Sequence, residues 1–347
     1  MNRIRIGTRG SQLALKQAAL VQEALAKADN RIETELLIYH TKGDRIQDRP
    51  ISEIGDKGVF ASELEQALLR GQIDLAVHSA KDLPMKLADG LTISGILKRA
   101  DVRDVLVVPR GGRIPSLRQA VRVSGGGLLT EDGAVQQGKM AGNIPYPFRI
   151  GTGSRRRQML AAMTWENVIC QEIRGNVDTR LRKLQEGSYD GILLAKAGLD
   201  RLGMGGEQAK EWDFYPLSPE LFLPAACQGI IAVETAKGAA AGELGRRITD
   251  VETQLCYQIE REVLAQLAVD CSEAAAAWCR LAREERSREG VYPADEQLRE
   301  AVPAADDLML DVMYAEKRVR LTCAAKTEEG KQLARQAALL VKGEGQI

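Results

Sequence analysis

Short apolar runs alternate with amphipathic segments along much of the chain, and this pattern predicts a mixed α/β fold. Residues 3–7 alternate as a strand, and apolar side chains then recur at helical spacing over residues 13–25. Ser11 directly precedes this helix and is a suitable N-cap, so the turn before it offers backbone N–H groups to an anion. A second strand is expected over residues 32–40.

A later apolar run, residues 75–77, leads into the polar sequence HSAKD at residues 78–82. Polar groups therefore gather at the end of a predicted strand, which is where open α/β sheets bind ligands. An ordinary solvated turn has the same composition, so this stretch alone leaves both interpretations open. We take Ser79, Lys81 and Asp82 as candidate site residues.

Two local patterns occur twice. Ile-Gly-Thr is found at residues 6–8 and 150–152, and Gly-x-x-Asp precedes an apolar run at residues 71–74 and 187–190. The polar segment 41–58 is long for a connection and accounts for much of the difference in spacing between the copies. The repetition predicts two similar α/β lobes.

The rest of the chain divides by composition. Residues 111–147 are rich in glycine and lack apolar periodicity, so we expect an inserted surface loop. A helical pattern begins at Val251, and strands near 308–314 and 318–324 precede a helix near 329–342, which suggests a small α+β domain. The expected domains are lobe 1 over residues 1–100 and 228–248, lobe 2 over 101–227, and the C-terminal α+β domain over 249–347.

Charge and length exclude some classes of protein. The chain of 347 residues carries 48 basic and 48 acidic side chains, so no global field directs it to nucleic acid or membrane. No apolar stretch of about 18 residues occurs, and the N-terminus has no signal-like segment. We therefore expect a cytoplasmic protein that binds neither membrane nor nucleic acid, and we expect a monomer.

The cysteines give no sign of a metal site. Six cysteines are scattered without a Cys-x-x-Cys pair, and the chain has two histidines. We expect no zinc, and we expect each cysteine to be a small buried apolar residue unless another argument applies. The six are Cys170, Cys227, Cys256, Cys271, Cys279 and Cys323.

Arginines cluster where the second lobe is predicted to begin. The sequence GTGSRRRQ, residues 151–158, opens a helix with the hydroxyls of Thr152 and Ser154 and three guanidiniums. A helix N-terminus beside arginines can bind a carboxylate or phosphate. Basic residues there oppose the helix dipole, so we expect Arg156 and Arg157 to be exposed, to add little to stability and to bind an anion.

A second cationic corner follows the apolar run 168–170, which is expected to be buried. Arg174 and Arg180 flank this corner, and Asn176 is a suitable N-cap for the next helix. With Arg9 and Lys81, two facing lobes would line one cleft with cations, which suggests a small polyanion as ligand. Nucleic acid is disfavoured because aromatic residues are only 4% of the chain.

Seven motifs occur in an order that identifies a family. They are IGTRGSQLAL, TKGD with GDKGVFASELE, DLAVHSAKDLP, IGTGSRRRQ, RGNVDTRL, YDGILLAKAGLDRLG and LPAACQG. Over residues 3–110 and 148–234 the chain resembles the porphobilinogen deaminases, also called hydroxymethylbilane synthases. The resemblance implies two lobes like those of periplasmic binding proteins, a third α+β domain, and joining of four porphobilinogens, with loss of ammonia, into a linear tetrapyrrole on a covalent dipyrromethane primer.

The resemblance also implies roles for individual residues. Asp82 matches the catalytic acid, which would protonate the departing amine and stabilise the cationic azafulvene and the pyrrole N–H groups. Gln228 would lie at the hinge side of the cleft. The carboxylates of substrate and cofactor would be bound by Arg9, Ser11, Lys57, Ser79, Lys81, Thr152, Ser154, Arg156, Arg157, Arg174, Arg180, Arg201 and Gln228.

Cys271 matches the cysteine that carries the primer through a thioether, because the family places it ten residues after an arginine that corresponds to Arg261. The family usually has Gly-Gly-Cys followed by Pro-Ile-Gly, whereas this chain reads VDCSEA over residues 269–274. Glu53 also stands where the family often has a second lysine. Residues 235–347 match the family only loosely.

Two other functions are compatible with the arginines. One is a non-catalytic cytoplasmic protein that binds polyanions on the same scaffold, and the other is a protein that binds nucleic acid through residues 154–158. Asp82 and Cys271 distinguish the enzyme from a simple binder, because a binder needs neither.

Overall fold

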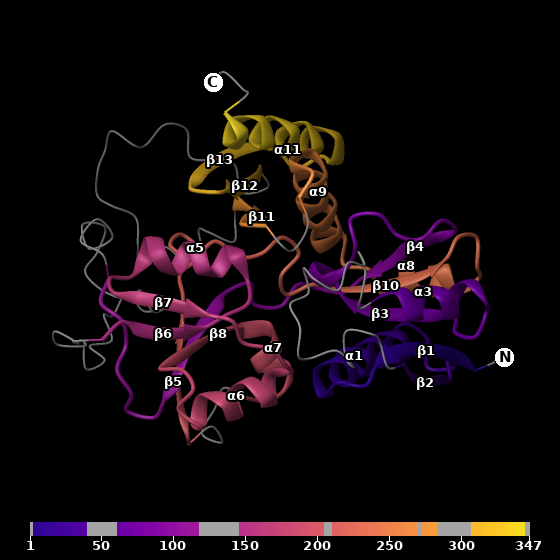
Figure 1. Cartoon of the computed structure of the whole chain (residues 1–347). Helices are drawn as coiled ribbons and strands as arrows, with labels where there is room; N and C mark the ends of the chain where they lie inside the picture. The colour runs from indigo at the N-terminus through magenta and orange to yellow at the C-terminus, as the bar shows by residue number, and fades with distance from the viewer. Residues whose placement is uncertain are drawn as a thin grey trace. The chain divides into compact units, whose positions relative to one another are not determined.

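The computed structural model describes residues 3–39, 61–117, 146–204, 210–269, 273–282 and 307–343 (Figure 1). The chain forms two compact units. The first comprises residues 1–101, 197–203 and 227–257, and the second comprises residues 102–196, 204–226 and 258–347.

The first unit is built on a five-stranded sheet in the order β2-β1-β3-β10-β4 (Figure 1). Its strands are β1 Ile4–Arg9, β2 Thr34–Tyr39, β3 Leu75–Ser79, β4 Leu91–Ile96 and β10 Ile231–Ala236. Strand β1 is parallel to β2 and β3, whereas β10 is antiparallel to both β3 and β4. The expected second strand is confirmed.

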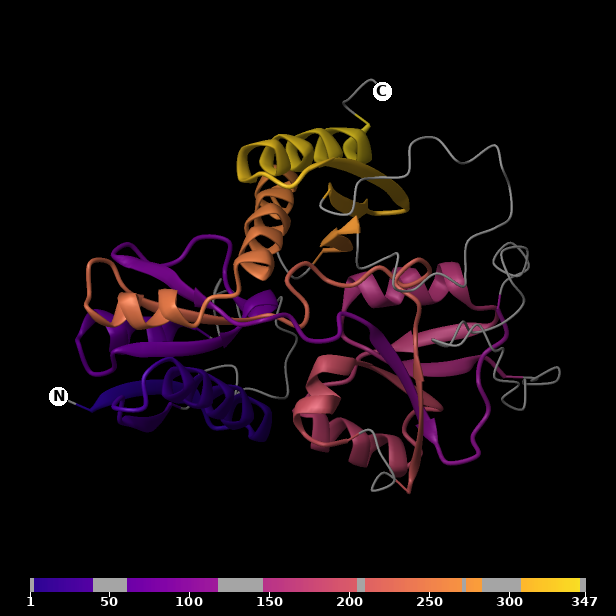
Figure 2. The same ribbon diagram turned by 180° about the vertical axis from the view of Figure 1, so that it is seen from behind.

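Helices cover both faces of this sheet (Figure 2). Helices α1 Gln12–Ala28 and α8 Ala241–Arg247 pack on one face, and α3 Ser62–Leu69 packs on the other. Val21 and Leu25 of α1 are buried, as expected, but Leu20 is exposed. A helix packed on one side buries only one stripe of side chains, and Leu20 faces away from the sheet.

The second unit contains a five-stranded sheet with an equivalent order, β7-β6-β8-β5-β9. Its strands are β5 Asp104–Pro109, β6 Phe148–Gly151, β7 Val168–Gln171, β8 Gly191–Ala195 and β9 Trp212–Pro216. The associated helices are α5 Arg155–Thr164 and α6 Val177–Gln185, whereas α7 Lys196–Arg201 belongs to the first compact unit from Ala197 onward. In both sheets three parallel strands are followed by a fourth strand of opposite direction and by a fifth that is antiparallel to the fourth, so the predicted repetition of two α/β lobes is confirmed.

The repeated Gly-x-x-Asp pattern has a structural cause. Arg5 Nη2 lies 2.8 Å from Asp74 Oδ1, and Arg149 Nη2 lies 2.9 Å from Asp190 Oδ1. In each lobe the aspartate also accepts a hydrogen bond from the backbone N–H of its arginine, at 2.8 Å. In the first lobe the aspartate therefore links β1 to the loop before β3. In the second lobe it links β6 to the loop before β8.

Two local predictions are wrong. Residues 168–170 were expected to be buried, but β7 is an edge strand and the side chain of Ile169 is 47% exposed. Residues 111–117 were expected in a surface loop, but Ile114 and Leu117 are buried in the core of the second unit. The described part of the expected insertion therefore helps to form the core, and residues 118–145 lie outside the described residues.

The C-terminal elements form the expected small α+β structure. Helix α9 Val251–Leu267 precedes a three-stranded antiparallel sheet, and α11 Thr327–Lys342 follows it. The strands are β11 Ala275–Leu281, β12 Asp307–Tyr314 and β13 Lys317–Ala324. A Cβ at Gly330 of α11 would lie 2.4 Å from the side chain of Ile259, so the glycine permits a close approach of α11 to α9.

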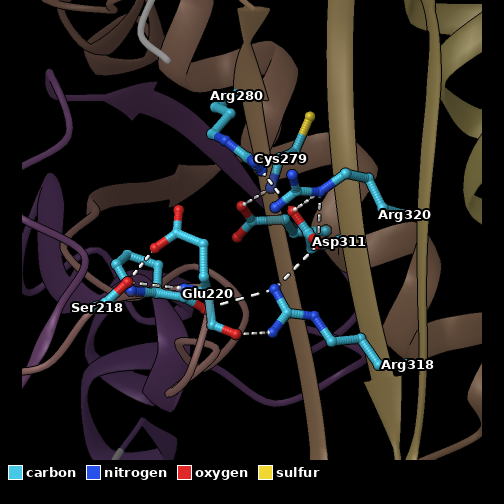
Figure 3. A network of polar contacts seen from close by, with 9 residues as sticks. Ser218, Glu220, Cys279, Arg280, Asp311, Arg318 and Arg320 are labelled. Atoms are coloured by element: carbon cyan, nitrogen blue, oxygen red, sulfur yellow. Dashed lines mark hydrogen bonds and ion pairs between the residues drawn. The ribbon is translucent and has the colours of Figure 1, made fainter. Parts of the chain in front are cut away.

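Three arginines of this sheet surround one buried aspartate (Figure 3). Asp311 lies within 3.1 Å of guanidinium nitrogens of Arg280, Arg318 and Arg320. Burial alone would raise the pKa of Asp311, but the three cationic charges outweigh burial and lower it. Arg318 also donates a hydrogen bond to the carbonyl of Glu220, which ties the sheet to the rest of the second unit.

Candidate functional site

Asp82 lies on a short turn between two buried residues, Ala80 and Leu83. Strand β3 ends at Ser79, and residues Ala80–Asp82 form one turn of 3-10 helix. Ala80 is fully buried and donates its backbone N–H to the carbonyl of Ile230 at 3.0 Å, and Leu83 is buried after the turn. The side chain of Asp82 is exposed. The sequence therefore places one carboxylate in solvent on a well-fixed backbone.

The neighbours of Asp82 have identifiable contacts within the first unit. Ser79 exchanges hydrogen bonds with the side chain of Gln17 from α1, with Gln17 Nε2 at 2.8 Å from Ser79 Oγ. Lys81 Nζ donates to Oε1 of the buried Gln228 at 3.4 Å. The structure thus brings together Lys81 and Gln228, which are separated by 147 residues.

The first turn of α1 begins as expected, with Ser11 before it. Ser11 is the N-cap, and its Oγ accepts the backbone N–H of Ala14 at 3.2 Å. No acidic residue lies in the first turn. Because Gly7 is in register with Ala76, Arg9 at the end of β1 lies at the same sheet edge as the end of β3. Arg9 is half-buried.

Arg201 is also part of the first unit. Its Nη2 donates to the carbonyl of Gly229 at 2.6 Å, next to Gln228. Burial lowers the pKa of Arg201 to about 10, so its guanidinium stays protonated at neutral pH. Gly229 has φ +87°, and a Cβ there would lie 2.6 Å from the carbonyl of Ala100, so this turn requires glycine.

In the second unit, α5 begins as the sequence predicted. Ser154 is the N-cap, with its Oγ accepting the backbone N–H of Arg157 at 3.4 Å. Thr152 is buried, and its Oγ1 accepts the backbone N–H of Ser154 at 3.2 Å. The hydroxyl of Thr152 therefore shapes the turn, and Ser154 is the more accessible of the two candidates.

The expectation of exposed guanidiniums at this helix start is wrong. Arg156 is 3% exposed and Arg157 is 8% exposed, and both pair with the fully buried Asp104 of β5. Arg156 Nη2 lies 2.7 Å from Asp104 Oδ2, and Arg157 Nη2 lies 2.7 Å from Asp104 Oδ1. Arg156 and Arg157 also donate to the carbonyls of Leu223 and Leu193.

This triad of Asp104, Arg156 and Arg157 explains how a helix can begin with two buried arginines. Burial alone would raise the pKa of Asp104, but the charges of Arg156 and Arg157 and their hydrogen bonds lower it. The carboxylate offsets the unfavourable interaction of the arginines with the helix dipole. Asp104 was not among the predicted residues, although an aspartate that opens a wholly apolar strand indicates a buried partner.

Arg174 and Arg180 flank the start of α6, as expected. Arg174 Nε lies 3.0 Å from Glu172 Oε1, and Arg180 Nε donates to the carbonyl of Gly175 at 2.8 Å. Asn176 occupies the N-cap position but makes no side-chain capping hydrogen bond. Arg174, Arg180 and the first backbone N–H groups of α6 therefore all lie at this corner.

Several candidates lie outside the described residues. They are Lys57, Glu53 and Cys271, and the segment 41–58 lies there as well. Of the described cysteines, Cys227, Cys256 and Cys279 are buried, as expected, whereas Cys170 and Cys323 are half-buried. Burial raises the pKa of Cys170 to about 11.

In the part of the chain that the structure describes, no group of three or more His, Cys, Asp or Glu side chains could hold a metal ion. None of the described helices is both long enough and apolar enough to span a membrane.

Comparisons with known proteins agree on one family. Residues 4–243 match the family model for the porphobilinogen deaminase, dipyromethane cofactor binding domain. The porphobilinogen deaminase of Lachnospira eligens is 43% identical over 235 residues, which are 67% of this chain and 69% of that protein. The porphobilinogen deaminase of Streptococcus sanguinis is 38% identical over 279 residues, or 80% and 82% of the two chains.

Among solved structures, the periplasmic VFT2 domain of BvgS from Bordetella pertussis covers 74% of this chain and 91% of its own. It has 12% sequence identity and a TM-score of 0.40. The fold assignment rests on the strand order described above and on the family match.

Proposed function

Because the chain belongs to the porphobilinogen deaminase family, we propose that it joins porphobilinogen molecules head to tail into the linear tetrapyrrole hydroxymethylbilane. In each step the bond from the aminomethyl carbon to nitrogen breaks and nitrogen leaves as ammonia. A carbon–carbon bond forms to the next pyrrole ring, which loses a proton. The reaction needs a proton donor for the amine, stabilisation of a carbon cation, and binding of several carboxylates.

The exposed carboxylate of Asp82 on its fixed turn carries this proposal. A carboxylic acid at this position can protonate the departing amine, and the resulting carboxylate can stabilise positive charge on the substrate. Its backbone is anchored by the buried Ala80 and Leu83, so the position of the exposed carboxylate is fixed. Lys81 lies next to it and can bind a substrate carboxylate.

The other candidates supply hydrogen-bond donors for acetate and propionate groups. In the first unit these donors are Arg9, Ser11 and the first turn of α1, and in the second they are Ser154, Arg174 and Arg180. Guanidiniums and helix N-termini are well suited to carboxylates. We assign Arg156 and Arg157 a positioning role, because their pairs with Asp104 fix the turn that carries Ser154.

The family binds dipyrromethane, and the donors of this chain fit that group. The carboxylates of a dipyrromethane need cationic or N–H partners, and Arg174, Arg180 and the start of α5 at Ser154 supply such donors. When bound, the cofactor supplies the pyrrole end to which substrate is added. We propose Cys271 as its thioether attachment, since the polar sequence around Cys271 suits an accessible sulfur.

The comparisons do not support the alternative of a non-catalytic polyanion-binding protein, because the relatives are named as deaminases. We propose further that the protein acts as a cytoplasmic monomer in three domains, with lobe 1 over residues 1–100 and 228–248, lobe 2 over 101–227 and the third over 249–347. The net charge of zero supports a protein that binds no nucleic acid. Size-exclusion chromatography with light scattering tests the monomer.

The experiment is ammonia release and tetrapyrrole formation from porphobilinogen by the wild type, Asp82→Asn and Asp89→Asn. Asp89 is an exposed aspartate seven positions further on that pairs with Lys86. We expect Asp82→Asn to lose activity by about 100-fold or more, since the amide keeps the shape but cannot donate the proton. Asp89→Asn should keep full activity. Near wild-type turnover by Asp82→Asn would refute the role of Asp82, and no turnover by the wild type would refute the function.

A further inference from the structure

A cavity of about 260 Å³ lies within the first unit. Helix α8 covers β4 and β10 at this place (Figure 2). It is lined by hydroxyl, amide and guanidinium groups together with small residues. The lining residues that matter for binding are Thr235, Gly242, Arg246 and Gln254. A water molecule takes about 30 Å³ in the liquid, so the space suits a small polar ligand.

Thr235 presents a buried hydroxyl that has no partner. Its side chain is 0% exposed, and its Oγ1 makes no hydrogen bond within the described structure. Leaving a buried hydroxyl unpaired is unfavourable, so such groups usually have a bound partner. The neighbouring strand residue Glu234 points to the opposite face of the sheet, where it pairs with His78. Because successive side chains of a strand alternate between the two faces, Thr235 lies on the face that α8 and the cavity cover.

The Nη1 atom of Arg246 also lies beside this cavity. Its Nε and Nη2 both donate to Glu243 Oε2, at 2.9 and 2.7 Å, which leaves Nη1 for another acceptor. A carbon at the Cβ position of Gly242 would lie 3.6 Å from Thr235 Oγ1 and 3.7 Å from Arg246 Nη1. The absent side chain of Gly242 therefore leaves space between a hydroxyl and a cationic donor.

We propose that this cavity binds a small anion, a carboxylate or a phosphate, between Thr235 and Arg246. Among the lining residues Arg246 is the charged one, and the hydroxyls and the amide of Gln254 can complete the hydrogen bonding of an oxyanion. The site is separate from the proposed active site. Ile231 is the β10 residue in register with Ser79, and Thr235 lies four residues, or about 13 Å, further along the strand.

The ligand would also connect separate elements of the first unit. Thr235 belongs to β10, Arg246 to α8 and Gln254 to α9. The segment between α8 and α9 is already bonded to the end of β4. Thr249 Oγ1 accepts the backbone N–H of Ile96 at 3.2 Å, and the carbonyl of Ile96 accepts the backbone N–H of Asp250. Binding should therefore raise the thermal stability of the first unit.

The test is calorimetric titration of the purified full-length protein with inorganic phosphate and, separately, with succinate, at constant ionic strength. Titration to about 10 mM fills nine-tenths of a site with a Kd of about 1 mM. Binding of phosphate alone identifies a phosphate site, and binding of succinate alone identifies a carboxylate site. Thr235→Val should weaken binding about fivefold or more, and Gly242→Ala should abolish it by filling the space.

Arg246→Gln and Arg247→Gln form a matched pair for the charge. Both arginines lie in α8 and pair with Glu243, but Arg247 does not line the cavity. Arg246→Gln should weaken binding about tenfold or more, and Arg247→Gln should change it little. Equal losses in the two variants, or unchanged affinity in Thr235→Val and Gly242→Ala, would place the anion elsewhere and overturn the proposal. Failure of the wild type to bind either anion would overturn it as well.

Discussion

Replacing Asp104 by Asn should destabilise the second unit strongly. Asp104 is the carboxylate partner of both Arg156 and Arg157, and all three side chains are buried. The substitution preserves the shape of the side chain and removes its charge. It leaves two guanidiniums close together in a region from which water is excluded, where neither can lose its proton.

The size of the effect follows from the burial. Removing one partner of a buried ion pair costs about 3–5 kcal/mol, because the remaining charge is left uncompensated. Asp104→Asn leaves two such charges, so a loss of about 3 kcal/mol or more in the free energy of unfolding is expected. At about 2–4 °C per kcal/mol for a unit of this size, the melting temperature should fall by at least about 6 °C.

Asp190→Asn is a suitable control. Asp190 also pairs with an arginine, Arg149, in the same five-stranded sheet, but their side chains are 38% and 41% exposed. A half-exposed pair contributes about 1 kcal/mol or less, so this variant should melt within a few degrees of wild type. Urea unfolding and thermal melts of both variants give the comparison. Equal melting temperatures for Asp104→Asn and wild type would refute the assigned role of the triad.

Three further predictions follow from the same contacts. Arg156→Leu should lower the melting temperature less than Asp104→Asn, because Asp104 keeps Arg157, and equal losses would contradict this order. Asp311→Asn should destabilise the protein by about 3 kcal/mol or more in urea unfolding, since three arginines lose their shared carboxylate, and a loss below about 1 kcal/mol would contradict it. The folded-state pKa values of Asp104 and Asp311 lie below the unfolded value of about 3.9, so their contribution to stability is full above about pH 5 and is lost as pH falls through the folded-state values. Urea midpoints measured from pH 6 to pH 3 should therefore fall more steeply for wild type than for Asp104→Asn.

Local patterns were sufficient to predict most of the secondary structure. The strand and turn at residues 75–82, the N-caps Ser11 and Ser154, and helix α9 were all found from short-range periodicity and capping rules. The repeated Gly-x-x-Asp pattern was also informative, because the aspartate bonds to a strand that begins many residues earlier. The strands, helices and caps depend on residues that are neighbours in sequence. The Gly-x-x-Asp pattern could be recognised because it occurs in both lobes.

Partners that are distant in sequence could not be predicted in this way. Arg156 and Asp104 are 52 residues apart. The fold alone brings them together, so the sequence predicted exposed ligand donors where the structure has a buried ion network. In the same way, nothing near Ser79 in sequence identified Gln17 as its partner. The exposure of β7 likewise depends on its position at the edge of a sheet, which is set by the order of all five strands.

The intact mass of the purified native protein tests the central claim most directly, because a covalent dipyrromethane would be measured without any assumption about turnover. We expect the mass of the polypeptide plus two pyrrole units, and we expect the polypeptide mass alone for Cys271→Ala, which should be inactive. The bare polypeptide mass in a wild-type preparation that converts porphobilinogen, or an unchanged mass and activity in Cys271→Ala, would contradict the account.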